Sequence, residues 1–323
     1  MNVTVMGLGL MGRRMAERIG QAFGAVTVWN RSPAKLEGMS FTGLHVAESV
    51  EAAVEESDFV ITMLTDGAAV ADLLFERGAA CAMRPGCTVI DMSSVAPSQA
   101  IDHEIRLAAR GIRHLDAPVS GGTAGAEDGT LAIMVGGECR AFEDALPVLR
   151  QLGRPVHLGP AGSGQVAKLA NQLIVGLTIG GVSEGIALAR SGGLDLEVFL
   201  GAIGNGLADG AVLRQLGPRM VRNDFEPRGR SSTHLKDIRN ACRYARDNGL
   251  HLPLSEQLES LFAALIDRHG DVDHSGLILN LGRAPSIEGR LRPPRDGFGH
   301  GDGFRDDDRG VPVDEDQRGR GKP

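Results

Sequence analysis

The sequence predicts an α/β domain with a doubly wound, mostly parallel sheet, followed by an all-α domain and a disordered C-terminal tail. Short β-branched runs alternate with helical patterns over the first half of the chain, and only helical periodicity continues after Gly164. Residues 283–323 hold few apolar side chains. The expected boundaries are therefore 1–162 for the α/β domain, 163–282 for the helical domain and 283–323 for the tail.

The strands of the first domain are expected at short runs of β-branched and apolar residues. Helical patterns such as 97–109 separate these runs, and this alternation favours a parallel sheet with helices on both faces. The expected strands cover 2–6, 25–29, 59–64, 88–92 and 112–116, with further strands possible at 131–135 and 156–158.

The second domain is expected to be entirely helical. Asp195 and Pro253 have the features of helix starts, and helix breaks are expected at 191–193, 204–206, 217–218 and 249. The apolar stretch 169–189 is interrupted by polar and glycine residues, so a buried helix is favoured over a membrane span. Because one small helical domain covers such a helix poorly, a homodimer or higher homo-oligomer is expected.

Composition narrows the class of protein. A chain of 323 residues with 42% hydrophobic and 23% charged residues is expected to fold around two cores. Its net charge of −7 argues against nucleic acid or an acidic membrane as the main partner. Four cysteines without a CxxC or Cys/His cluster predict neither disulfides nor a metal site. Met1 leads straight into the first expected strand, so a cytoplasmic protein is expected.

The tail, 283–323, is rich in Gly and Pro and carries equal numbers of basic and acidic residues. It has too little apolar surface to offset the entropy cost of ordering, so disorder is expected. Because its charges balance, a solvated appendage is favoured over a basic nucleic-acid-binding arm.

A glycine-rich loop follows the first expected strand. Gly7, Gly9 and Gly12 form the pattern G-x-G-x-x-G, which opens an amphipathic helix. Such glycines allow a tight turn, the approach of a pyrophosphate and close helix packing. The strand-turn-helix context therefore predicts a dinucleotide-binding Rossmann domain, whose loop also includes Leu8, Leu10 and Met11.

The end of the second expected strand bears on the choice of dinucleotide. It reads Asn30, Arg31 and Ser32, without the carboxylate that would hold a ribose 2′-hydroxyl. An arginine beside hydroxyl and amide groups suits a 2′-phosphate. NADP(H) is therefore favoured over NAD(H). The alternative is that Arg31 is only a solvated loop residue and that either cofactor is used.

A hydride-transfer enzyme needs a proton donor and acceptor beside the carbonyl oxygen. Tyr244 is followed four residues later by Asn248, so a Tyr-x-x-x-Lys pair is absent. Lys168 and Asn171 share one face of an otherwise apolar helix. Partial burial would lower the pKa of Lys168 and suit it to proton exchange near neutrality.

The chain resembles the β-hydroxyacid dehydrogenase family, which includes 3-hydroxyisobutyrate dehydrogenase, tartronate semialdehyde reductase and glyoxylate/succinic semialdehyde reductases. The resemblance covers about residues 1–281 and depends on five motifs in order. They are the N-terminal glycine loop and the segments 91–97, 116–131, 164–171 and 236–237.

The resemblance implies roles for individual residues. Ser120, Gly121 and Gly122 match the run that binds the substrate carboxylate, and adjacent amides with a hydroxyl can form a small anion site. Lys168 matches the catalytic lysine, and Asn171 matches a residue that holds the substrate.

Three further matches concern the cofactor and the closing of the cleft. Ser94 matches the position that approaches the nicotinamide. Lys236 and Asp237 match the pair from the helical domain, with Lys236 contacting both cofactor and substrate. A plain surface charge pair is the alternative for these two residues.

Two features depart from the family pattern. Gly229 stands where a pocket phenylalanine is usual, so a more polar pocket is expected in which Arg230, Ser231 or His234 contacts the substrate. For His234, a polar residue at a helix start is favoured over a catalytic base. The second departure is the tail, 283–323.

These observations predict an NADP(H)-preferring oxidoreductase that interconverts a small β-hydroxyacid and its semialdehyde. The alternatives are an imine reductase-like enzyme, a 6-phosphogluconate-dehydrogenase-like decarboxylating enzyme, and a non-catalytic NADP-binding sensor or scaffold. Imine reductases generally lack the lysine matched by Lys168, and the decarboxylating enzymes have a much longer helical domain.

Overall fold

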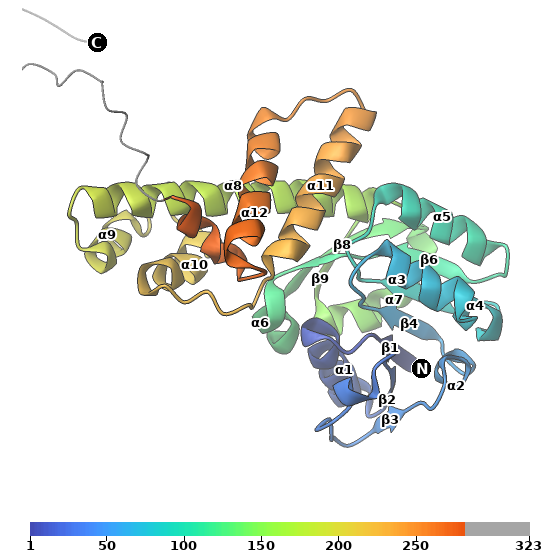
Figure 1. The fold of residues 1–323 in the computed structure, drawn as a ribbon. Helices are drawn as coiled ribbons and strands as arrows, with labels where there is room; N and C mark the ends of the chain where they lie inside the picture. Colours follow the sequence, from blue (N-terminus) through green and yellow to red (C-terminus); the bar gives the residue numbers. More distant parts are fainter. Residues whose placement is uncertain (282–323) are drawn as a thin grey trace, which may run out of the picture. The chain divides into compact units, whose positions relative to one another are not determined.

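The computed structural model describes residues 1–281, whose first half forms a nine-stranded sheet with helices on both faces (Figure 1). The strand order is β3-β2-β1-β4-β5-β6-β8-β7, and β9 pairs with β8. The strands are β1 (Val3–Met6), β2 (Val26–Trp29), β3 (Leu44–Val46), β4 (Phe59–Thr62), β5 (Thr88–Asp91), β6 (Arg113–Asp116), β7 (Val119–Ser120), β8 (Leu131–Gly137) and β9 (Gly153–Gly159).

The sheet is mostly parallel. Strands β1 to β6 pair in parallel, as do β8 and β9, whereas β8 runs antiparallel to both β6 and β7. From the central pair β1–β4, the chain adds β2 and β3 on one side and β5 and β6 on the other. The sheet is therefore doubly wound, as predicted.

The helices of this half connect successive strands. They are α1 (Leu10–Phe23), α2 (Val50–Val54), α3 (Gly67–Ala71), α4 (Ala79–Ala82), α5 (Pro97–Ala108), α6 (Gly122–Asp128) and α7 (Cys139–Leu152), with short helical segments η1 (Pro33–Lys35) and η2 (Asp72–Glu76). Helix α1 ends where Gly24 adopts a left-handed conformation, which glycine reaches without steric cost.

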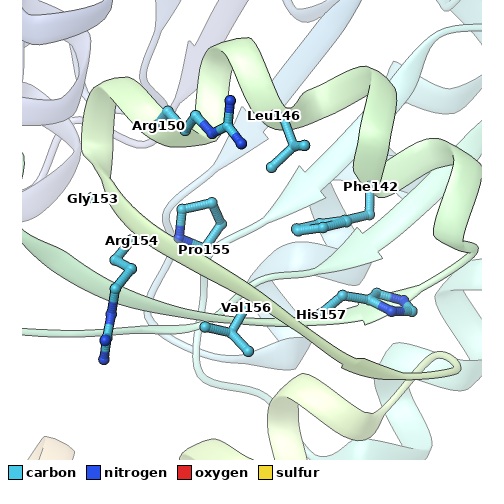
Figure 2. Close-up of a pocket in the computed structure, with 8 residues that line it drawn as sticks. All are labelled: Phe142, Leu146, Arg150, Gly153, Arg154, Pro155, Val156 and His157. Atoms are coloured by element: carbon cyan, nitrogen blue, oxygen red, sulfur yellow. The ribbon is translucent and has the colours of Figure 1, made fainter.

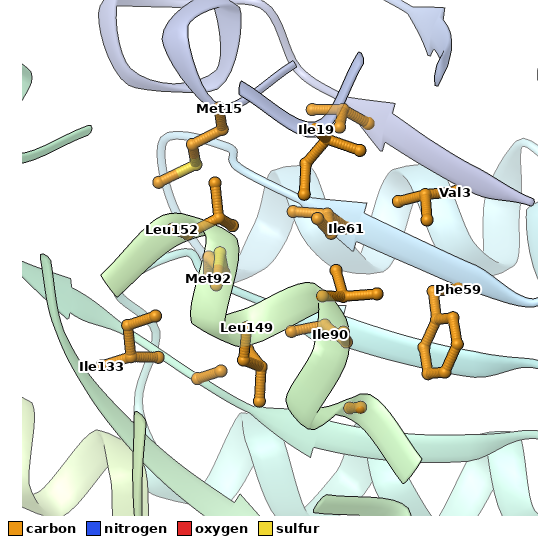
Figure 3. Packing of buried hydrophobic residues seen from close by; sticks show 14 of the residues in the cluster. Val3, Met15, Ile19, Phe59, Ile61, Ile90, Met92, Ile133, Leu149 and Leu152 are labelled. Atoms are coloured by element: carbon orange, nitrogen blue, oxygen red, sulfur yellow. The ribbon is translucent and has the colours of Figure 1, made fainter. Parts of the chain in front are cut away.

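Two apolar clusters lie on the two faces of the sheet. On β4, Phe59 and Ile61 face one cluster and Val60 faces the other, as the period of two residues in a strand requires. The first cluster packs α1 and α7 over β1, β4, β5 and β8 (Figure 3). The second packs α2, α4 and α5 against the opposite face. Burial on both faces explains why the central strands are continuously buried and mostly apolar.

The second half is helical. It contains α8 (Ser163–Ser191), α9 (Leu196–Ile203), α10 (Ala211–Arg222), α11 (Ser231–Asp247), α12 (Pro253–His269) and the short segment η3 (His274–Asn280). The side chain of Asp195 caps α9 by accepting from the amides of Glu197 and Val198, so this helix start is confirmed.

The break expected at 217–218 is wrong, because α10 continues through Pro218 to Arg222. The buried face of this helix includes Leu213, Leu216 and Met220. Gly217 lies close to Leu200, with 3.2 Å between its ideal Cβ position and Leu200 Cδ2. Tertiary packing thus outweighs the lost backbone hydrogen bond of the proline.

Helix α8 is, among residues 1–281, the helix long and apolar enough to cross a membrane by length and composition alone, a test that core helices also pass. It contacts α10, α11 and η3 in the helical half and β8 in the sheet. Only 28% of its most apolar window is buried within the chain, and Ile174 and Leu188 are strongly exposed. The tail, 283–323, for which disorder was expected, lies outside the described residues.

Candidate active site

The glycine loop joins β1 to α1 with little room for side chains. Gly7 has a φ of +98°, and a Cβ on Gly12 would lie 1.9 Å from the carbonyl oxygen of Gly7. A Cβ on Gly9, in contrast, would meet only open space. The two outer glycines are therefore needed for the turn itself, and the open side at Gly9 fits a pyrophosphate against the backbone.

Asn30 ties this loop to the end of β2. Its Oδ1 accepts a hydrogen bond from the Leu8 amide at 2.9 Å, and its Nδ2 donates to the Ser32 carbonyl at 2.8 Å. The side chain thus holds the loop in shape, while its neighbours Arg31 and Ser32 are exposed. The exposed arginine and hydroxyl fit a 2′-phosphate at this strand end, where a carboxylate would oppose it.

Lys168 lies in the second turn of α8 and is only 8% exposed. Its Nζ donates to the Val119 carbonyl at 2.8 Å and to Gln172 Oε1 at 2.9 Å. Burial lowers the pKa of Lys168 to about 8, against the opposing attraction of Asp237. A protonated ammonium has three N–H groups, and two are used by described residues, so one remains for a substrate oxygen.

Gln172 connects Lys168 to α11. Its Oε1 also accepts from Asn171 Nδ2 at 3.0 Å, and its Nε2 donates to Asp237 Oδ2 at 2.8 Å. Asn171 Nδ2 in turn lies 3.3 Å from Ser120 Oγ. Sequence reasoning did not select Gln172, although its place one helical turn after Lys168 put it on the same face.

Residues of α11 complete this network. Ser94 Oγ donates to Asp237 Oδ1 at 2.9 Å, and Lys236 Nζ donates to the carbonyls of Ser94 at 2.8 Å and Thr65 at 3.1 Å. Lys236 also forms an ion pair with Asp237 at 3.3 Å. The surface charge pair considered from sequence is therefore wrong for Asp237. This residue is 1% exposed and is hydrogen-bonded to Ser94 and Gln172.

The expected carboxylate site follows β7. Ser120 ends this strand, and Gly121 and Gly122 have φ values of +136° and +65°. Side chains other than glycine are strained at these angles, so both glycines are required by the backbone. The Ser120 hydroxyl lies beside Asn171, and the carbonyl of the preceding residue, Val119, contacts Lys168.

Asp116 and Gln165 fix the start of α8. Asp116 accepts from the amides of Gly162 at 2.8 Å and Gln165 at 2.9 Å, and burial raises its pKa to about 6. The Gln165 side chain accepts from the Val95 amide and donates to the Ser93 carbonyl. Sequence reasoning gave neither residue a role. They align α8, and hence Lys168, with the loop that carries Ser94.

Among the residues around Gly229, His234 borders this network, because it lies near the Gln172 backbone and the charges of Asp237 and Lys168 act on it. Arg230 pairs with Asp271 at 3.0 Å. His234 lies near the start of α11 as expected, but it is 3% exposed and stacks on Phe262, and burial lowers its pKa to about 4. An ideal Cβ on Gly229 would lie 2.8 Å from the imidazole of His274, which occupies this space. Ser231 is buried at the helix start.

A surface hollow between α7 and β9 contains none of these residues. It is lined by Phe142, Leu146, Arg150, Gly153, Arg154, Pro155, Val156 and His157 (Figure 2). The Phe142 and His157 rings lie 5.2 Å apart at its edge. The site residues instead gather where β5, β7, α8 and α11 meet.

Two family models together match nearly all of the described chain. The model described as the NAD binding domain of 6-phosphogluconate dehydrogenase matches residues 2–162. The model described as NAD-binding of NADP-dependent 3-hydroxyisobutyrate dehydrogenase matches residues 162–281.

Individual proteins are similar over the same length. The 2-hydroxy-3-oxopropionate reductase of Escherichia coli (strain K12) is 36% identical over 281 residues, which cover 86% of this chain and 96% of that protein. The solved structure of Mycobacterium tuberculosis 3-hydroxyisobutyrate dehydrogenase with L-serine has a TM-score of 0.79 at 30% identity and covers 88% of this chain and 99% of its own. A reductive aminase from Aspergillus terreus with NADPH and ethyl levulinate has a TM-score of 0.57 at 27% identity, covering 87% and 99%.

Proposed function

Because the chain belongs to the β-hydroxyacid dehydrogenase family and is an NAD(P)-dependent oxidoreductase, we propose that it prefers NADP(H) and interconverts a small β-hydroxyacid and its semialdehyde. The observation that carries this proposal is the environment of Lys168. Its amine is buried, held by two acceptors and has a pKa near 8. A general acid and base works best with a pKa near the working pH.

Lys168 moves the proton in the proposed reaction. In the reducing direction, the ammonium gives a proton to the substrate oxygen as the carbonyl becomes an alcohol. In the oxidising direction, the neutral amine takes the proton of the substrate hydroxyl. NADP(H), when bound, supplies or accepts the hydride at the carbon that bears this oxygen. The Val119 carbonyl and Gln172 fix Nζ in place, which lowers the entropy cost of this transfer.

The substrate carboxylate is proposed to bind at Ser120, Gly121 and Gly122, with Asn171 orienting the substrate beside it. The hydrogen bond between Asn171 and Ser120 supports this placement, because it brings an amide and a hydroxyl donor to one side of Lys168. An anionic group there is favoured by amides and by the two lysines, Lys168 and Lys236. The Mycobacterium tuberculosis structure was solved with L-serine, a small hydroxylated carboxylic acid, which supports this substrate class.

The cofactor is proposed to lie along the glycine loop, Gly7 to Gly12 with Leu8, Leu10 and Met11. Asn30, Arg31 and Ser32 would contact the ribose and its 2′-phosphate, since β2 ends without a carboxylate. Ser94 and Lys236 would border the nicotinamide, where the Lys236 ammonium already bridges the Ser94 and Thr65 carbonyls.

A panel of small hydroxyacids and semialdehydes, assayed with NADP(H) and with NAD(H), tests this function. The expected result is turnover of at least one β-hydroxyacid and semialdehyde pair, with the higher kcat/KM for NADP(H). Binding of NADP(H) without turnover of any member of the panel would contradict the proposal and favour a sensor.

An imine reductase-like activity is the rival enzyme, supported by the likeness to the Aspergillus terreus reductive aminase. That likeness is more distant in fold than the one to 3-hydroxyisobutyrate dehydrogenase, with TM-scores of 0.57 and 0.79. Lys168 with its hydrogen-bonded amine also favours alcohol and carbonyl chemistry. Reduction of cyclic imines faster than of semialdehydes would reverse this preference.

We propose a cytoplasmic homodimer or higher homo-oligomer that packs the exposed apolar side chains of α8, among them Ile174 and Leu188, against a second copy. Neither a nucleic acid nor a membrane surface is proposed as a partner, since the chain carries a net charge of −7.

A further inference from the structure

Three polar side chains lie together inside the apolar core between the sheet and α5. Asp91 ends β5, His114 belongs to the neighbouring strand β6, and His103 lies on the helix that connects them. They are 0%, 2% and 2% exposed. One potential ligand atom from each lies within 4.8 Å of the other two. Polar groups buried this deeply normally have hydrogen-bond partners.

Four atoms of this cluster are unpartnered among residues 1–281: Asp91 Oδ2, His103 Nδ1, and both Nδ1 and Nε2 of His114. The other oxygen of Asp91 is held firmly, because Oδ1 accepts from Thr62 Oγ1 at 2.8 Å and from the Ser93 amide at 3.0 Å. Each unpartnered buried group costs free energy. A ligand that accepts an electron pair from one atom of each side chain would remove this cost for three of the four atoms.

We propose that Asp91, His103 and His114 bind a divalent transition metal such as Zn²⁺. Two imidazoles and a carboxylate are a common zinc ligand set, with the fourth position left for water. Ligand atoms of a tetrahedral zinc site lie about 3.4 Å apart, given bonds of about 2.0 to 2.1 Å. The cluster therefore closes around the ion by side-chain shifts on the order of 1 Å.

The surroundings favour metal binding over a charged cluster. Neither ring nitrogen of His114 has a hydrogen-bond partner among residues 1–281, so a nitrogen lone pair of this imidazole is available to a metal ion. The Thr62 hydroxyl and the Ser93 amide orient the carboxylate of Asp91, as groups around a metal ligand commonly do. The Phe75 ring lies 5.7 Å from the His103 ring and keeps the cluster apolar on that side.

This site is separate from the proposed reaction. Lys168, Asn171 and Ser120 do not contact the three ligands through any hydrogen bond of the described chain. The two sites are linked through Ser93, whose amide donates to Asp91 and whose carbonyl accepts from Gln165, and through Asp116, which pairs with Asp91 across β5 and β6. The metal would therefore stabilise the β5–α5–β6 unit and the loop that carries Ser94. The sequence offered no such signal, because the three ligands are far apart and fit no metal-binding spacing.

Zinc titration of the full chain tests the proposal. The protein is stripped with a chelator, incubated with ZnCl₂ and passed through gel filtration, and its metal content and Tm are measured. We expect about one zinc per chain, and a rise in Tm of about 5 °C at a zinc concentration 100 times Kd. His103→Leu and His114→Leu should each abolish both effects. His45→Gln, which changes an exposed histidine, should leave both unchanged.

A spectroscopic readout keeps the test independent of the variants' folding. Co²⁺ bound to the unmodified chain by two histidines and a carboxylate should give the intense visible absorption of four- or five-coordinate cobalt. No bound metal, a weak octahedral cobalt spectrum, or zinc binding that survives His103→Leu and His114→Leu would overturn the proposal. In those cases the three side chains form a buried neutral cluster or the metal lies on the surface.

Discussion

Gln172 joins groups that are far apart in the sequence, because it contacts Lys168 and Asn171 on its own helix and Asp237 on α11. Lys168 and Asn171 could be selected from sequence, since a lysine in an apolar helix is unusual and the motif resembles a known family. Gln172 could not, because its role depends on Asp237, and no spacing in the sequence reveals that contact.

A substitution of Gln172 should change the pH dependence of the reaction. Gln172→Glu places a carboxylate beside Lys168 Nζ, which raises the pKa of the lysine. In the oxidising direction the amine must be neutral, so the rise of kcat with pH should move to higher pH by about one unit or more. Pre-steady-state or steady-state pH profiles measure this shift. Gln151→Glu on α7 is the matched control, and an identical profile for Gln172→Glu would disprove the role of Gln172.

The choice of cofactor should depend on Arg31. Arg31→Ala removes the charge proposed to meet the 2′-phosphate, and a hydrogen bond to a charged group contributes about 1.5 to 3 kcal/mol. We expect kcat/KM for NADP(H) to fall by roughly 10- to 100-fold while kcat/KM for NAD(H) stays within about twofold. Arg77→Ala, which changes an arginine paired with Asp72 away from the site, is the control. Equal losses with both cofactors would show that Arg31 does not read the phosphate.

Whole elements were predictable from sequence where local patterns and burial agree. The central strands were found because they are buried on both faces and therefore mostly apolar. Strands β3 and β7 were missed, since Leu44–Val46 is largely exposed and Val119–Ser120 has two residues. The break expected at Pro218 failed because packing against Leu200 outweighs the local preference. Such contacts depend on residues distant in the sequence.

The alignment of α8 should depend on Asp116, which accepts two backbone amides at the start of that helix. Asp116→Ala leaves both buried donors without this acceptor, at a cost of about 1 to 3 kcal/mol. We expect Tm to fall by about 3 to 9 °C. The kcat should also decrease, because Lys168 shifts with the helix. Differential scanning calorimetry and turnover assays measure both effects. Asp102→Ala on the exposed side of α5 is the control, and equal losses for the two variants would rule out a specific role of Asp116.

At the scale of the whole molecule, the proposed machinery lies within residues 1–281, and both family models end by 281. A chain ending at residue 282 should therefore keep the turnover and the Tm of the full chain. Its mass by light scattering should equal that of the full-length homodimer less two tails. Loss of turnover or dissociation on removal of 283–323 would instead assign the tail a functional role and support the scaffold alternative.

The central claim is that Lys168 is the proton donor and acceptor, and Lys168→Ala tests it most directly. Turnover should fall by about 10²- to 10⁴-fold, the usual contribution of a positioned acid or base. Binding of NADP(H), measured by fluorescence titration, should persist, since the hydrogen bonds of Lys168 in the described chain go to Val119 and Gln172 and not to the glycine loop. In the unmodified chain, kcat for oxidation should rise with an apparent pKa near 8 as the buried amine loses its proton. Turnover indifferent to Lys168→Ala would contradict the account.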